Sequence, residues 1–154
     1  MEEEALPFTA DYLKAEKIAL RLIARAEQTS SGLAAKLRKR GIDPSITGQV
    51  ISSLIEKNLL DDTRYAEHWI CAQLHGRKPP SPLWFLVSLE KRGIDRKTSL
   101  VAINKILDEE TEYSLLLKFI DRVDVSIKKD EFFRTKLRHE GFSPEVIGRF
   151  FDSK

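Results

Sequence analysis

Apolar residues recur at the same offsets around three glycines of the 154-residue chain, Gly41, Gly93 and Gly141. They stand eight and four residues before each glycine and one, five, nine and ten residues after it, with Thr98 as the exception. Such spacing places side chains on one face of a helix. The pattern therefore predicts a helix that ends at each glycine and another that begins just after it. The aligned positions before the glycines are Leu33, Phe85 and Phe133, then Leu37, Leu89 and Leu137; those after them are Ile42, Ile94 and Phe142, then Ile46, Thr98 and Val146, then Val50, Ala102 and Phe150, then Ile51, Ile103 and Phe151.

The residues that follow each glycine predict a tight corner between two helices. Glycine tolerates the left-handed conformation that closes a helix, and an apolar residue just after it packs back onto the last turn. Asp43, Asp95 and Ser143 stand two residues beyond the glycines and are typical N-cap residues, while Pro44 and Pro144 suit the first helical position. The chain is thus expected to form the same corner three times.

The corners recur from residue 41 to 93 and from 93 to 141, spacings of 52 and 48 residues. A further helical segment precedes each corner, at residues 10–26, 62–75 and 111–123, and no alternating strand pattern competes with them. We interpret this as an all-α fold, a tandem array of three three-helix units that is elongated and curved. The units are expected at residues 9–60, 61–109 and 110–154, and neighbouring units are expected to share buried faces.

Composition and charge exclude several classes of protein. The formal net charge is only +2, so any case for nucleic-acid binding depends on where the charges cluster. Cys71 is the only cysteine, which excludes an internal disulfide and fits a reducing compartment. The acidic start "MEEEALPF" does not resemble a secretory signal, and the apolar run "YSLLLKFI" is far shorter than the roughly 20 residues that span a bilayer. We expect a cytoplasmic protein with no membrane contact.

Candidate catalytic and metal-binding residues have simpler structural interpretations. Asp61 and Asp62 precede a helix, so helix capping explains them better than acid–base chemistry. His68, Cys71 and His75 share one helical face, but a zinc site usually needs a further ligand or a water. Phosphate-binding, dinucleotide-binding and hydrolase motifs are all missing. The sequence predicts no enzyme activity, catalytic residue, metal or cofactor.

Basic residues gather near the predicted corners. Stacked corners would bring them together as a basic strip suited to a polyanion, although cations in a last helical turn also interact favourably with the helix dipole and keep a surface soluble. Both interpretations stay open from the sequence. The candidate binding residues are Lys36, Arg38, Lys39, Arg40, Arg77, Lys78, Lys91, Arg92, Arg96, Lys97, Arg134, Lys136 and Arg138.

Three segments resemble the RecX family of bacterial regulators of the RecA recombinase: "LAAKLRKRGID" (33–43), "ISSLIEKNLLDDTRYAEHWI" (51–70) and "LVSLEKRGID" (86–95). The middle segment is the most specific, and the resemblance covers roughly residues 15–150. It implies tandem three-helix units and a protein that lies in the groove of the RecA–DNA filament and restrains its ATPase, strand exchange and growth during DNA repair, recombination and the SOS response. Asp61, Asp62, Tyr65 and Ala66 match the central motif and Gly41 and Gly93 its corners, all as scaffold, whereas "RKPPSP" replaces the glycine and basic residues typical of the family.

The leading hypothesis is a monomeric regulator of the RecA filament that contacts single- or double-stranded DNA within the filament. Two other functions are also considered. A free-standing DNA-binding protein would use a corner as a helix-turn-helix, but no helix rich in Arg, Asn and Gln is visible. A protein–protein scaffold would use aromatic residues, most of which occupy offsets expected to be buried. These are Trp69, Trp84, Phe85, Phe132, Phe133, Phe150 and Phe151.

Overall fold

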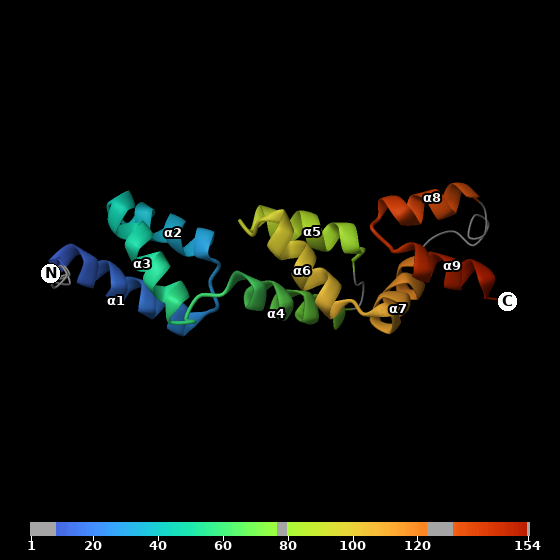
Figure 1. The fold of residues 1–154 in the computed structure, drawn as a ribbon, viewed down its shortest axis with the longest axis horizontal. Helices are drawn as coiled ribbons and strands as arrows, with labels where there is room; N and C mark the ends of the chain where they lie inside the picture. The colour runs from blue at the N-terminus through green and yellow to red at the C-terminus, as the bar shows by residue number, and fades with distance from the viewer. Residues whose placement is uncertain (1–8, 77–79, 123–130, 154) are drawn as a thin grey trace, which may run out of the picture. The chain divides into compact units, whose positions relative to one another are not determined.

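The computed structural model of the chain describes residues 9–76, 80–122 and 131–153. All regular structure within these residues is helical, so the all-α fold class is confirmed (Figure 1). No helix in this described part is long and apolar enough to cross a membrane. The helices are α1 (Ala10–Arg25), α2 (Ser30–Lys39), α3 (Pro44–Glu56), α4 (Asp62–Leu74), α5 (Pro82–Lys91), α6 (Arg96–Ile106), α7 (Glu109–Ile120), α8 (Glu131–His139) and α9 (Pro144–Asp152).

Short polar side chains fix where the helices begin. In α1, for example, the backbone N–H of Tyr12 donates to Thr9 Oγ1 at 3.1 Å. Such an N-cap satisfies an amide that has no partner inside the helix and contributes about 1 kcal/mol. The other observed caps, for α2 to α7 and α9 in chain order, are Thr29, Asp43, Asp61, Ser81, Asp95, Asp108 and Ser143.

The chain divides into two compact units, Met1–Tyr65 and Ala66–Lys154, here called the N-terminal and C-terminal units. In the N-terminal unit α1, α2 and α3 pack on one another around fully buried Leu33, Leu37 and Val50. Ala15 and Ala19 of α1 are also fully buried, and their small side chains allow the helices to approach closely. Full burial of a leucine such as Leu33 or Leu37 stabilises the folded state by about 1.5–3 kcal/mol.

Asp62 ties the end of the N-terminal unit to α2. The backbone N–H of Ser30 donates to Asp62 Oδ1 at 2.8 Å and the Ser30 hydroxyl donates to Asp62 Oδ2 at 2.6 Å. The sequence interpretation assigned both Asp61 and Asp62 to capping, and this is confirmed for Asp61, which accepts from the N–H of Arg64 at 3.1 Å. Asp62 stands in the first turn of α4, where the helix dipole favours a carboxylate, but it does not cap this helix because its carboxylate accepts from Ser30, 32 residues away.

In the C-terminal unit α5 packs on α6, while α9 packs on α7 and α8. The ring of Trp69 on α4 stacks on that of Trp84 on α5 with centroids 5.4 Å apart. Glu67 of α4 pairs with Lys105 of α6 at 3.0 Å. These contacts explain why α4 belongs with the two helices that follow it in sequence.

The turn between α8 and α9 rests against the first turn of α5. The backbone N–H of Leu83 donates to the carbonyl of Glu140 at 2.8 Å, and the hydroxyl of Ser81 donates to Glu140 Oε2 at 2.8 Å. A Cβ at Gly141 would lie 2.9 Å from the backbone nitrogen of Leu83. Residues about 60 positions apart thus form one close backbone contact, which the sequence spacing did not indicate.

Candidate interaction surface

The three predicted corners share one backbone geometry. Gly41, Gly93 and Gly141 have φ of 85°, 86° and 93°, which confirms the left-handed conformation expected of them. At the first corner the N–H of Gly41 donates to the carbonyl of Arg38 at 2.9 Å, and the N–H of Ile42 donates to that of Leu37 at 3.2 Å. The other two corners repeat both bonds with distances of 3.0 to 3.2 Å.

These bonds define a Schellman motif, which satisfies the last carbonyls of a helix and brings an apolar residue back onto its final turn. The apolar residues involved pack on the core: Leu37, Leu89 and Leu137 are fully covered, Ile94 and Phe142 are only 1% and 3% exposed, and Ile42 is partly buried. The backbone of each corner is therefore fixed by hydrogen bonds and by core packing together. The cationic side chains on the preceding helical turn are therefore attached to a rigid backbone.

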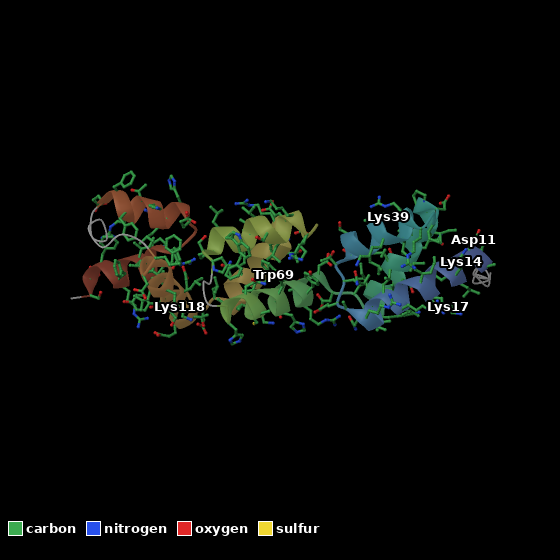
Figure 2. The ribbon with its side chains drawn as sticks, turned by 180° about the vertical axis from the view of Figure 1, so that it is seen from behind. Asp11, Lys14, Lys17, Lys39, Trp69 and Lys118 are labelled. Atoms are coloured by element: carbon green, nitrogen blue, oxygen red, sulfur yellow. The ribbon has the colours of Figure 1, made fainter. Side chains whose placement is uncertain are left out.

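The first corner carries the densest cluster of cations. Residues 36–40 contain four basic side chains, all exposed, and no carboxylate. Lys36 Nζ donates to Gln28 Oε1 at 2.8 Å, whereas Arg38, Lys39 and Arg40 make no ion pair with any described residue. Figure 2 shows Lys39 at the upper edge of the N-terminal unit. This cluster keeps its full positive charge available to a partner.

At the second corner, neighbouring side chains offset more of the positive charge than at the first corner. Lys91, Arg92, Arg96 and Lys97 are all exposed, but Arg96 pairs with Glu90 at 3.6 Å. Arg92 lies over the ring of Trp69, with its guanidinium carbon 4.9 Å from the ring centroid. Hydrogen bonds from the amide and then the hydroxyl of Thr98 hold the pKa of Asp95 below its ordinary value, so an ionised carboxylate stands beside these cations.

At the third corner one candidate cation, Arg134, packs against other residues of the fold. Arg134 is half-buried, lies 4.3 Å from the centroid of Phe151 and pairs with Glu131 at 3.6 Å. Lys136 and Arg138 are exposed and make no ion pair with a described residue. Of the predicted cations of this corner, these two are open to a partner.

The structure groups the candidates within each corner. In the C-terminal unit the second corner follows the last turn of α5, whereas the third corner contacts the first turn of the same helix. Ten residues of helix separate these ends, about 15 Å at 1.5 Å per residue. Arg77 and Lys78, the remaining candidates, lie outside the described residues.

Three of the seven aromatic candidates for a protein interface belong to the core. Phe85 and Phe133 are fully buried and Phe150 is 9% exposed. Trp69 and Phe151 are partly buried, whereas Trp84 and Phe132 are 44% and 75% exposed. Trp84 borders an open hollow of about 450 Å³, whose other lining residues are Pro80, Ser81, Leu83, Val87, Phe119, Arg122 and Glu140.

Polar side chains from distant parts of the chain hold several helix starts in place. Asp62 holds Ser30, Glu140 holds Ser81, and Glu112 Oε1 accepts from the N–H of Ser143 at 2.6 Å. Each pair is more than 30 residues apart and no spacing rule links its members. The described residues contain no group of three His, Cys, Asp or Glu side chains that could hold a metal, the stripe of His68, Cys71 and His75 included.

Comparison with known proteins gives consistent results. The family profile described as "RecX, first three-helix domain" matches residues 15–54. A protein named Regulatory protein RecX from Treponema pallidum is 29% identical over 145 residues, covering 94% of this chain and 88% of the relative. One of the same name from Halorhodospira halophila is 38% identical over 76 residues, covering 49% and 46%.

Solved structures share the fold. The crystal structure of RecX from Lactobacillus salivarius aligns with a TM-score of 0.70 and 24% identity, covering 92% of this chain and 97% of that one. A second, titled as a crystal structure of regulatory protein RecX, aligns with a TM-score of 0.69 and 20% identity, covering 93% and 72%. The matching profile, the relatives along almost the whole chain and the common helical fold all show that this chain is similar to RecX proteins.

Proposed function

We propose that this chain is a non-enzymatic regulator of the RecA recombinase. It binds in the groove of the RecA–DNA filament and inhibits or modulates filament growth, ATPase activity and strand exchange in DNA repair and recombination. The observation that carries the proposal is the exposed cation cluster of residues 36–40 at the first corner, which stands on a Schellman turn and makes no ion pair with a described residue. The relatives named Regulatory protein RecX support the regulatory role.

The corners suit a polyanionic filament for a physical reason. A cation that meets a phosphate releases condensed counterions, which favours binding at low salt. Because the backbone of each corner is already fixed, little conformational entropy is lost when its side chains bind. Several rigid cationic corners on one chain would engage a repeating polymer at several points, so that their contributions accumulate.

The candidate cations differ in how available they are. Those without an ion pair to a described residue are expected to contribute most to binding, and Arg134 the least, because its guanidinium is half-buried against Phe151. Arg96 is intermediate, since its partner Glu90 is itself 42% exposed and easily displaced. The expected leading contributors are Lys36, Arg38, Lys39, Arg40, Lys91, Lys97, Lys136 and Arg138.

A charge-reversal experiment tests the proposal. The triple variant Arg38→Glu/Lys39→Glu/Arg40→Glu is compared with the wild type for its effect on the single-stranded-DNA-dependent ATPase of a bacterial RecA and on filament light scattering. We expect the wild type to lower ATPase turnover at stoichiometric amounts and the variant to lose this effect. A wild-type chain without effect on either signal would end the proposal.

A matched control separates local charge from net charge. Lys57, Lys105 and Lys118 are exposed cations away from the corners, and their reversal to Glu gives the same change in net charge. Because Lys57 and Lys105 pair with Glu16 and Glu67, circular dichroism is used to verify that this variant remains folded. This control variant is expected to keep the effect on RecA. Equal loss in both variants would show that overall charge, rather than the first corner, is what matters.

A free-standing DNA-binding protein is distinguished from a RecA regulator by whether it prefers RecA filaments to DNA alone. A RecA regulator should co-sediment with RecA filaments more than with the same DNA alone, whereas a plain DNA-binding protein should bind both alike. Its affinity for duplex DNA would also fall with salt by about 0.9 per phosphate contact on a log–log plot. The other competing function, a protein–protein scaffold, would use the exposed rings of Trp84 and Phe132. Charge reversal at the first corner would leave scaffold binding intact.

A further inference from the structure

Helix α1 carries a row of four cations that the corners do not include. Lys14, Lys17, Arg21 and Arg25 are all exposed and fall within roughly 80° of one another around the axis, given 3.6 residues per turn. They extend over about 16 Å, with close to one cation per turn. None of them forms an ion pair with a described residue.

The alignment of these cations disfavours the helix that carries them. Lys17 and Arg21, and Arg21 and Arg25, are spaced at (i, i+4), where like charges repel. Among the four cations only Arg25, in the last turn of α1, is favoured by the helix dipole, because Lys14, Lys17 and Arg21 lie outside the terminal turns. Solubility requires surface charge but not its alignment, and the helix dipole accounts for Arg25 alone, so neither explains the whole row.

An exposed apolar strip runs beside the row on the same outward face of α1. Leu13 and Leu20 are 52% and 40% exposed, and Ala24 continues their line. The core side of the helix is formed by Tyr12, Ala15 and Ala19, on the opposite face. Figure 2 shows Lys17 at the edge of the N-terminal unit opposite Lys39, so this surface is separate from the first corner.

We propose that this face of α1 is a second binding surface, for the phosphate backbone and bases of single-stranded nucleic acid. A polyanion relieves the repulsion at every member of the row, because it presents a negative charge at regular intervals. The neighbouring leucines favour a single strand over a duplex, since unstacked bases can cover apolar surface whereas a duplex presents only sugar and phosphate. The inference rests on the proposed function, in which the chain meets single-stranded DNA within a filament.

The test uses the full chain and a labelled oligothymidylate without RecA, followed by fluorescence anisotropy at several salt concentrations. The variant Lys14→Gln/Lys17→Gln/Arg21→Gln/Arg25→Gln removes the row, and glutamine keeps the helix propensity high. If all four cations meet phosphates, the log–log salt slope of binding should weaken by about 0.7 for each lost contact, or roughly 2.8 in total. An unchanged slope would overturn the inference.

A control variant makes the same change in net charge elsewhere on the surface and is expected to keep the wild-type slope. Circular dichroism shows whether both variants remain helical. If the α1 and control variants weaken the slope equally, net charge explains the binding and the inference fails. The control replacements are Lys57→Gln, Lys105→Gln, Lys118→Gln and Arg122→Gln.

Competition identifies the occupant of this face. Unlabelled oligothymidylate should displace the probe more effectively than either a duplex or polyglutamate at equal charge. Displacement led by the duplex would overturn the single-strand assignment, and displacement led by polyglutamate would assign the face to an acidic protein. If the wild-type chain has no effect on RecA but still binds oligothymidylate through α1, the proposed function is overturned and this second binding surface is retained.

Discussion

The two corner glycines Gly41 and Gly141 offer a direct test of how local and tertiary constraints combine. Both have a left-handed backbone, with φ of 85° and 93°. A Cβ at Gly41 would meet nothing within 4 Å, whereas one at Gly141 would lie 2.9 Å from the nitrogen of Leu83 and 3.2 Å from Pro82 Cβ. The same substitution to alanine thus adds a steric clash at only one of two equivalent positions.

The expected losses follow from these distances. Gly41→Ala forces an L-residue into the left-handed region, which costs about 1–2 kcal/mol of unfolding free energy. Gly141→Ala carries the same cost, and it also pushes the backbone of α5 away, which adds about 1–3 kcal/mol as in other overpacked sites. The bond from the Leu83 N–H to the carbonyl of Glu140 makes this contact difficult to relax, because shifting α5 weakens it.

Urea unfolding separates the two effects. Both tryptophans, Trp69 and Trp84, lie in the C-terminal unit, so their fluorescence reports on that unit, while circular dichroism at helical wavelengths reports on the whole chain. We expect Gly141→Ala to move the fluorescence midpoint to lower urea. Gly41→Ala should affect the fluorescence less than the helical signal.

Two helical glycines provide matched controls. A Cβ at Gly48 in α3 or at Gly148 in α9 would meet nothing within 4 Å, and neither glycine has a positive φ. Alanine at either position should raise the free energy of unfolding by about 0.5–1 kcal/mol. The reasoning is refuted if Gly141→Ala costs no more than Gly41→Ala, because the close contact with α5 would then carry no energetic weight.

Three further predictions concern single side chains. Asp62→Ala should lower the unfolding free energy by about 1–3 kcal/mol, because two hydrogen bonds to Ser30 are lost, and a loss below that of the capping variant Asp61→Ala would contradict this. Thr47→Val should raise it by about 1 kcal/mol in urea titrations, since the buried Thr47 hydroxyl has no hydrogen-bond partner among the described residues, and destabilisation would show otherwise. The folded-state pKa of Asp95 lies below 3.8, so its contribution is present above that pH and lost as pH falls through the folded value. Melting curves of Asp95→Asn should therefore differ from wild type above pH 3.8 and converge below it.

The helix order and the corners were predictable because local rules decide them. Leu37, Leu89 and Leu137 sit four residues before a glycine and all three are fully buried. Asp43, Asp95 and Ser143 cap the next helix as their residue types predict. Helical periodicity, left-handed glycine and N-capping act over a few residues, so one sequence displays them directly.

The candidate cations were predictable as residues but not in their surroundings. Arg38, Lys39 and Arg40 are exposed as a surface cluster should be, whereas Arg134 is half-buried over Phe151. Nothing in the sequence near residue 134 indicates that a ring 17 positions later will cover its guanidinium. Whether a charge is available to a partner depends on such contacts.

The sequence alone determined the all-α class, the ends of most helices, the left-handed glycines and the family resemblance, because short-range sterics and hydrogen bonding specify them. Only the tertiary structure decided that Asp62 holds Ser30, that Glu140 and Gly141 rest on α5, and which cations keep their charge free. These contacts join residues tens of positions apart. They form only after helices pack, when shape and burial select partners that no local pattern encodes.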